Sequence, residues 1–336
     1  MKLRLFLSIF ILCFICGCGN DDKATDATVS ISSSPASEYA TQGGSQAVTE
    51  GTTEVTSQPD TQPATKAPSP SSDFYPINTE GLEIYDAGPY KVIDPDNKRG
   101  LSTTLLGYGF GISSNGQVPQ ASINNQKRFD SMKVQALSVD IKSSEKTLYL
   151  TFDCGYEYLD NTSLILNTLK EKQAPAAFFC TYPFITSNSA KVQRMIDEGH
   201  IVGNHSTTHP NFPNITRIQM AKELYGVYEI LKKEHNYETK YFRFPAGRNS
   251  DSSLDLVASQ GYRSIFWSVA YGDWDTANQM GPDKAFATLT SLVHPGAVIL
   301  LHGVSSDNVA ILGKFIDWAR DRGYTFKSLD DYYAMK

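Results

Sequence analysis

Two histidines and a carboxylate have the types and spacing that hydrolytic chemistry needs. His205 and His209 are four residues apart in the segment His-Ser-Thr-Thr-His-Pro. A helical turn would bring both imidazoles to one side, which is a common way to present two nitrogen ligands to a metal. Asp153 and Cys154 end a short run of β-forming residues. Each residue alone fits an ordinary turn or cap, but a carboxylate together with paired histidines indicates metal-assisted hydrolysis.

Other polar residues stand at the ends of apolar runs in the same way. Arg243, Asp273 and His302 each follow or end such a run. Taken singly they fit a surface charge or a core histidine. Taken together they occupy equivalent positions at successive strand ends, where α/β enzymes build their sites.

The elements that must position these residues alternate regularly. Glycines follow several helical patterns shortly before the next strand, as C′ glycines do. This order predicts a parallel β/α architecture, and a barrel is favoured because no phosphate-binding glycine fingerprint follows the first strand. The expected strands are 147–152, 176–181, 200–204, 241–244, 262–268, 297–302 and 325–329. The expected helices are 163–172, 189–198, 217–234, 253–260, 283–293 and 307–321.

These segments resemble the five motifs of the polysaccharide deacetylases, the NodB-like carbohydrate esterases. The resemblance implies an α/β fold of the distorted (β/α)7 barrel type and a hydrolase that removes N-acetyl groups. It covers residue 146 to the C-terminus. The matching segments are 151–155, 205–210, 243–245, 273–274 and 301–302.

Further segments look like one subgroup, the delta-lactam-biosynthetic de-N-acetylases. They are 107–111, 155–157, 266–268 and 323–328. The likeness implies deacetylation of N-acetylmuramic acid in peptidoglycan strands, leading to the muramic δ-lactam of the spore cortex. Two alternatives stay open: a deacetylase of N-acetylglucosamine polymers, and a glycan-binding lipoprotein weakened in catalysis.

The family resemblance also implies roles. Asp153 is the expected general base, oriented by Arg243, and His302 is the expected general acid, held by Asp273. The expected substrate contacts are Tyr156, Ala246, Trp274 and Leu301, with a backbone N–H near Ala246 helping to bind the oxyanion.

His205 and His209 are the expected metal ligands, and Cys154 is a candidate third. Cys154 stands where most family members carry a second Asp. A thiolate suits zinc, so we expect zinc, with cobalt or manganese as alternatives. Cys154 could instead pair with Cys180 in a disulfide.

The N-terminus is typical of an exported lipoprotein. Lys2 and Arg4 precede the apolar run 5–15, which ends near Gly17-Cys18. This resembles a lipobox that leaves Cys18 lipidated, so we expect an extracytoplasmic, membrane-anchored protein, or a secreted one if the lipobox is not used. The net charge of −6 excludes general attraction to nucleic acid. We expect a monomer.

Composition divides the chain into four parts. Residues 1–17 are the expected signal peptide, and 18–72 are a Ser/Thr/Pro-rich tether with too few large apolar residues to fold. Residues 73–139 are expected to form an ordered extension that wraps the main domain. Residues 140–336 form the expected catalytic domain.

Overall fold

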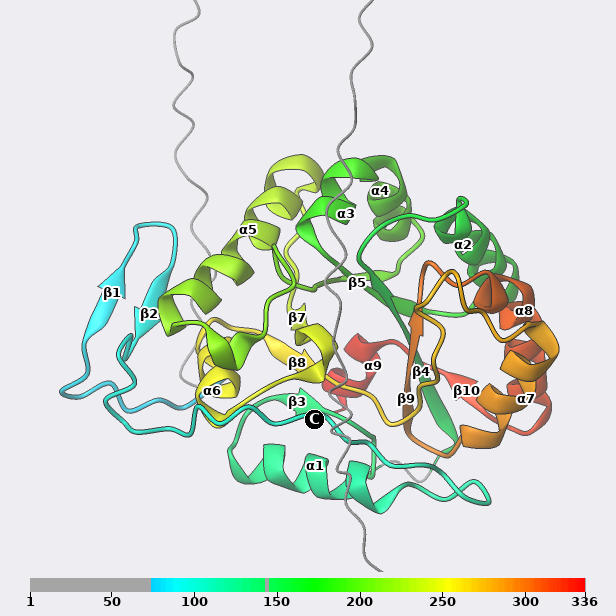
Figure 1. Cartoon of the computed structure of the whole chain (residues 1–336), viewed down its shortest axis with the longest axis horizontal. Coiled ribbons are helices and arrows are strands. Elements are labelled where there is room, and N and C mark those ends of the chain that lie inside the picture. The colour runs from blue at the N-terminus through cyan, green and yellow to red at the C-terminus, as the bar shows by residue number, and fades with distance from the viewer. Residues whose placement is uncertain (1–73, 143–144, 336) are drawn as a thin grey trace, which may run out of the picture. The chain divides into compact units, whose positions relative to one another are not determined.

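The computed structural model describes residues 74–142 and 145–335, and the predicted signal peptide and tether lie outside them. Eight strands form one sheet in the order β10-β4-β5-β6-β7-β8-β3, with β9 also paired to β4. All pairings between these strands are parallel, and most helices lie around them, whereas the C-terminal helix α9 lies near the middle of the view (Figure 1). The strands are β3 (Ala136–Leu137), β4 (Thr147–Cys154), β5 (Ala176–Cys180), β6 (Ile201–Asn204), β7 (Tyr241–Phe242), β8 (Arg263–Ile265), β9 (Ala297–His302) and β10 (Thr325–Phe326).

The sheet curls as the expected barrel does, but one strand comes from outside the expected catalytic domain. Strand β3 belongs to the extension and pairs with β8. Isolated bridges Val139–Ala297 and Val269–Ile299 link this side of the sheet to β9. The distorted barrel is therefore confirmed, and the boundary expected at residue 140 falls after a strand of the same sheet.

All six expected helices are present. Gly199, Gly261 and Gly323 follow three of them with φ of +79°, +85° and +79°, as expected for C′ glycines. Helices α1, α3 and α9 are not expected from the sequence. The sequence of α1 is mostly polar, so its apolar periodicity is weak. The helices are α1 (Gln120–Ser131), α2 (Asn161–Lys172), α3 (Tyr182–Ser187), α4 (Ser189–Asp197), α5 (Arg217–His235), α6 (Asp251–Ser259), α7 (Pro282–Leu292), α8 (Ser306–Asp321) and α9 (Leu329–Ala334), with 3₁₀ turns η1 (Phe212–Asn214) and η2 (Pro245–Gly247).

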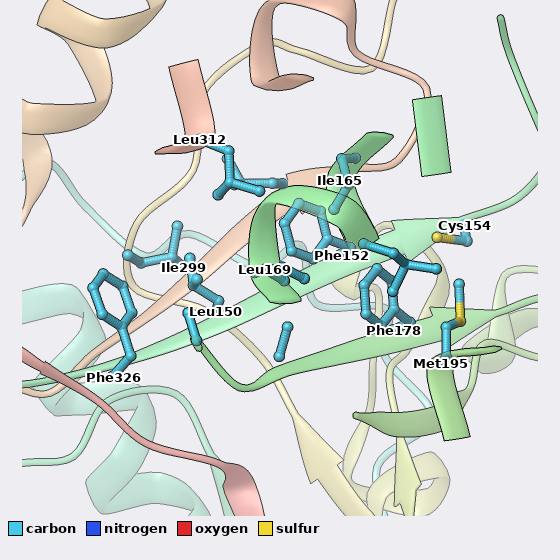
Figure 2. Close-up of a cluster of buried hydrophobic side chains, with 14 of the residues drawn as sticks. Leu150, Phe152, Cys154, Ile165, Leu169, Phe178, Met195, Ile299, Leu312 and Phe326 are labelled. Atoms are coloured by element: carbon cyan, nitrogen blue, oxygen red, sulfur yellow. The ribbon is translucent and has the colours of Figure 1, made fainter. Parts of the chain in front are cut away.

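Side chains of β4 alternate between two apolar layers. Tyr149 lies in a cluster inside the barrel with Phe179 of β5 and Tyr332 of α9. Leu150 and Phe152 face the other way and pack in the layer between the strands and the outer helices (Figure 2). Successive residues of a strand point to opposite faces, so this phase places Asp153 on the inner side and Cys154 on the outer side.

Buried ion pairs hold the extension on the barrel. After the hairpin of β1 (Ile84–Asp86) and β2 (Lys91–Ile93), both terminal nitrogens of Arg99 donate to the carboxylate of Asp255 in α6 at 2.9 and 2.6 Å. Arg217 of α5 donates to the same carboxylate at 2.7 Å. The extension thus shares one charge network with two helices of the barrel.

Candidate active site

A cavity of about 610 Å³ opens beyond the C-terminal ends of the strands. Seven of the expected site residues line it: Asp153, Tyr156, His205, His209, Ala246, Trp274 and His302. Sequence reasoning missed the remaining lining residues: Gly155, Thr181, Pro183, Thr207, Thr208, Trp267, Leu300 and Val304. Thr181 could have been predicted in the same way as the other site residues, because it is a polar residue that directly follows β5.

Asp153 and Arg243 form a buried ion pair at the base of this cavity. Nη1 of Arg243 donates to Oδ1 of Asp153 at 2.7 Å, and Nη2 donates to the Thr151 hydroxyl at 2.8 Å. The guanidinium also lies over the ring of Phe179, 4.2 Å from its centroid. Burial acts to raise the pKa of Asp153, but the positive charge of Arg243 and smaller effects of two histidines hold that pKa below its usual value. Asp153 is therefore held as a carboxylate.

The imidazoles of His205 and His209 lie together beside Asp153. Their ring centroids are 4.9 Å apart. Nδ1 of His205 lies 3.0 Å from the carbonyl oxygen of Arg243. Since a carbonyl only accepts, Nδ1 carries the proton, and the lone pair of Nε2 faces Oδ2 of Asp153 at 3.4 Å. Burial lowers the pKa of His205 to about 4, so its ring is neutral at pH 7.

The expected helical turn between the two histidines is wrong. Strand β6 ends at Asn204, and the backbone of Ser206 and His209 is left-handed, with φ of +72° and +57°. The Ser206 hydroxyl accepts the N–H of His209 at 3.0 Å and closes the loop. A tight loop, which the four-residue spacing alone does not reveal, brings the rings together.

His302 is fixed by Asp273, as expected. Its Nδ1 donates to Oδ1 of Asp273 at 2.7 Å, while its backbone N–H donates to Oδ2 at 2.8 Å. The side-chain amide of Asn308, in α8, donates to the same Oδ2 at 2.6 Å. Burial acts to lower the pKa of His302, yet the hydrogen bond and charge of Asp273 raise it above its usual value. Sequence reasoning missed Asn308, which carries no motif signal.

The expected role of Cys154 as a metal ligand is wrong, because the structure does not bring its side chain to the site. Its side chain is fully buried in the outer apolar layer with Phe152 and Phe178, as Figure 2 shows. It aligns with Cys180 on β5, and both thiols are free. The two thiols lie on the face of the sheet opposite to Asp153.

The prediction that Leu301 contacts the substrate is also wrong, by one residue. Its side chain is 1% exposed and packs in the outer layer, whereas its neighbour Leu300 lines the cavity. Residues 298, 300 and 302 of β9 point inward, and 297, 299 and 301 point outward, because a strand has a period of two. The apolar wall at this position is therefore Leu300.

The donor set fits a divalent metal with few protein ligands. His205 and His209 are both kept neutral, burial being the largest cause of their lowered pKa values. Neutral imidazole is the form that binds metal, and the carbonyl of Arg243 fixes the tautomer of His205 as an outer hydrogen bond does in metal sites. Within residues 74–142 and 145–335, no group of three or more His, Cys, Asp or Glu side chains is arranged to hold a metal ion. The side chains that would hold a metal here are two imidazoles, which lie beside one carboxylate.

A carboxylate paired with a buried arginine, two neutral imidazoles and an aspartate-bound histidine, all at the C-terminal ends of barrel strands, define a hydrolytic α/β enzyme. The sequence model of the family described as "Polysaccharide deacetylase" matches residues 140–265. The chain belongs to this family, which cleaves N-acetyl amide bonds of polysaccharides and is in general metal-dependent.

Relatives and solved structures support this membership. The chain is 40% identical over 237 residues to peptidoglycan-N-acetylmuramic acid deacetylase PdaA of Bacillus subtilis, covering 69% of this chain and 87% of that protein. It is 30% identical over 192 residues to a peptidoglycan-N-acetylglucosamine deacetylase of Bacillus cereus, covering 55% and 67%. The structure of Bacillus subtilis PdaA, a family 4 carbohydrate esterase, superposes with a TM-score of 0.65 at 36% identity, covering 70% of this chain and 100% of that one.

In the described part of the chain, none of the helices is both long and apolar enough to cross a membrane.

Proposed function

We propose that this protein removes the acetyl group from N-acetylmuramic acid residues of peptidoglycan strands. The observation that carries the proposal is the 40% identity, across 87% of its length, to a deacetylase of that residue. The exposed aromatic side chains of Tyr156 and Trp274, at 54% and 62%, stand at the cavity wall and suit stacking against sugar rings.

The proposed reaction is hydrolysis of the acetamide. Asp153 takes a proton from the attacking water, and Arg243 keeps that carboxylate ionised and oriented. The backbone N–H of Ala246 donates to the developing oxyanion. His302 gives its proton to the leaving amine nitrogen, and Asp273 holds the ring in the tautomer that this transfer needs. Water and amide become acetate and a free amine.

His205 and His209 are the proposed metal ligands. A divalent metal bound there supplies Lewis acidity toward the acetyl carbonyl. Imidazole nitrogens suit zinc, and we propose zinc with cobalt or manganese as alternatives. Water would complete the coordination of a metal that the protein holds by these two nitrogens.

The free amine on muramic acid lies close to the lactyl carboxyl of the same sugar, and their condensation closes a six-membered δ-lactam. We therefore propose a place in spore-cortex synthesis. Relatives that act on peptidoglycan work outside the cytoplasm, which agrees with a lipobox and tether at residues 1–72. Replacing Cys18 by Ala should release the protein from membranes, and unchanged retention would contradict the lipid anchor.

One experiment separates the substrate classes. The full-length chain is incubated with purified peptidoglycan strands and Zn²⁺, and acetate and free amines are located by mass spectrometry. Amines on muramic acid support the proposal, and amines on glucosamine alone overturn it in favour of the second activity found among the relatives. No release with Zn²⁺, Co²⁺ or Mn²⁺ would favour a glycan-binding lipoprotein. We propose that the protein acts as a monomer.

A further inference from the structure

The loop that carries the two histidines is held in an unfavourable backbone conformation. Ser206 and His209 have φ of +72° and +57°. For residues with a side chain this left-handed region costs about 1–2 kcal/mol each, so the surroundings must hold it. The Ser206 N–H donates to Oδ1 of Asn204 at 2.8 Å, and the His209 N–H donates to the Ser206 hydroxyl at 3.0 Å, so both bonds are internal to this segment.

Glu223 reaches the loop from another element. This residue lies in α5, and its Oε2 accepts the backbone N–H groups of Thr207 and Thr208 at 2.9 and 2.7 Å. Its Oε1 accepts the hydroxyl of Thr208 at 2.8 Å. The Thr207 hydroxyl in turn donates to the backbone carbonyl of Glu223 at 2.9 Å. Four hydrogen bonds thus join one residue of the helix to the two residues that separate Ser206 from His209.

A glycine lets the helix and the loop approach this closely. Gly226 follows Glu223 by three residues, so it lies on the same side of α5. A Cβ at this position would lie 2.4 Å from the Thr207 hydroxyl oxygen. Glycine inside a helix costs about 0.5–1 kcal/mol relative to alanine. Close contact with the loop is the physical reason for glycine at this position.

We propose that Glu223 is a positioning residue for the two-histidine metal site, an inference that rests on the proposed metal binding. Its carboxylate fixes the loop so that both imidazoles stay beside Asp153. It acts through the hydrogen bonds and not through its charge, because a neutral glutamine has the atoms to replace them. The glutamine oxygen can accept both backbone N–H groups, and its amide can donate to the Thr208 hydroxyl.

Zn²⁺ and Co²⁺ binding to the full-length, metal-stripped chain tests this inference by titration calorimetry. Outer hydrogen bonds of metal sites change metal affinity by about 10–100-fold, so Glu223→Ala should raise the Kd for both ions by that factor. Glu223→Gln should restore most of the affinity. Thr208→Val, which removes one of the four bonds at an exposed position, should raise the Kd by a smaller factor. Glu229→Ala is the matched control, since Glu229 lies in the same helix but accepts from Tyr225.

The outcomes separate this inference from the metal site itself. Unchanged Kd in Glu223→Ala, or an equal loss in Glu223→Gln and Glu223→Ala, would overturn the positioning role or its hydrogen-bond basis. If Glu223→Ala does not fold, an unchanged Kd in Thr208→Val overturns it. If the wild-type chain binds neither ion, the proposed metal site fails instead.

Discussion

Arg243 donates from Nη1 to Oδ1 of Asp153 at 2.7 Å, and their side chains are 0% and 9% exposed. The contact joins the end of β4 to the residue that follows β7, across the inside of the barrel. It keeps a carboxylate charged where burial would otherwise favour its neutral form. Stability and the proposed catalysis therefore depend on the same ion pair.

Replacing Asp153 by Asn should lower acetate release by about 10²–10⁴-fold, because the amide cannot accept the proton from water. The measurement is acetate release from peptidoglycan strands at saturating zinc. A circular dichroism spectrum like that of the wild type shows that the fold is retained. Substantial remaining activity would mean that the base is assigned to the wrong residue.

Replacing Arg243 by Met should lower the free energy of unfolding by about 3–5 kcal/mol, since it leaves a buried carboxylate without its partner. Urea titration measures the change. The double variant with Asp153→Asn should recover part of the loss, because no unpaired charge is then buried. A loss in the double variant equal to the sum of the losses in Arg243→Met and Asp153→Asn would show that the pair is not coupled.

Replacing Asp273 by Asn should move the basic limb of the pH–rate profile to lower pH. Burial acts to lower the pKa of His302, and the Asp273 carboxylate raises it. Without that charge, the imidazolium loses its proton at lower pH, and the acid is absent over a wider alkaline range. A profile of kcat against pH checks this, and an unmoved basic limb would remove His302 from the role of acid.

Replacing Cys154 by Ala should leave the Kd for zinc unchanged, because the thiol lies in the outer apolar layer. The free energy of unfolding should fall by about 1–2 kcal/mol through the lost packing. His209→Ala is the comparison that should abolish binding. A loss of zinc affinity as large as that in His209→Ala would restore Cys154 as a ligand.

Replacing Arg248 by Met should raise KM for strands bearing muramic acid by about 10-fold, with a smaller effect on glucosamine substrates. Arg248 is exposed and donates to Asn211 at 2.6 Å. Arg248 follows Ala246, which lines the cavity, by two residues. Burial is the largest cause of the lowered pKa of His209, and the charge of Arg248 is the smallest. A lactyl carboxylate would gain a charge-assisted hydrogen bond of about 1.5–3 kcal/mol there.

Lys172→Met, on the outer helix α2, is the matched control for Arg248→Met. If Arg248→Met changes KM equally for muramic acid and glucosamine substrates, Arg248 does not recognise the lactyl group.

The sequence by itself determined the order of strands and helices and which strand ends carry polar groups. Regular apolar runs, C′ glycines and motif spacing are local signals, and they are sufficient to assign Asp153, His205, His209 and His302 to one rim of the barrel. Strand β3 and helix α1 were not predicted, because a strand of two residues and a mostly polar helix show little apolar periodicity.

Only the tertiary structure decided which way the side chains of each strand point. Every residue of β4 is buried, because parallel strands in a barrel are covered on both faces, and such strands read as continuous apolar runs with no phase. The packing of Phe152 against the outer helices sets that phase. Asp153 therefore points toward the cavity and Cys154 points away from it. The same alternation in β9 makes Leu300, and not the predicted Leu301, part of the cavity wall. The loop between His205 and His209 depends on Glu223 in α5, the next α-helix along the chain, and the spacing of the two histidines does not reveal this contact.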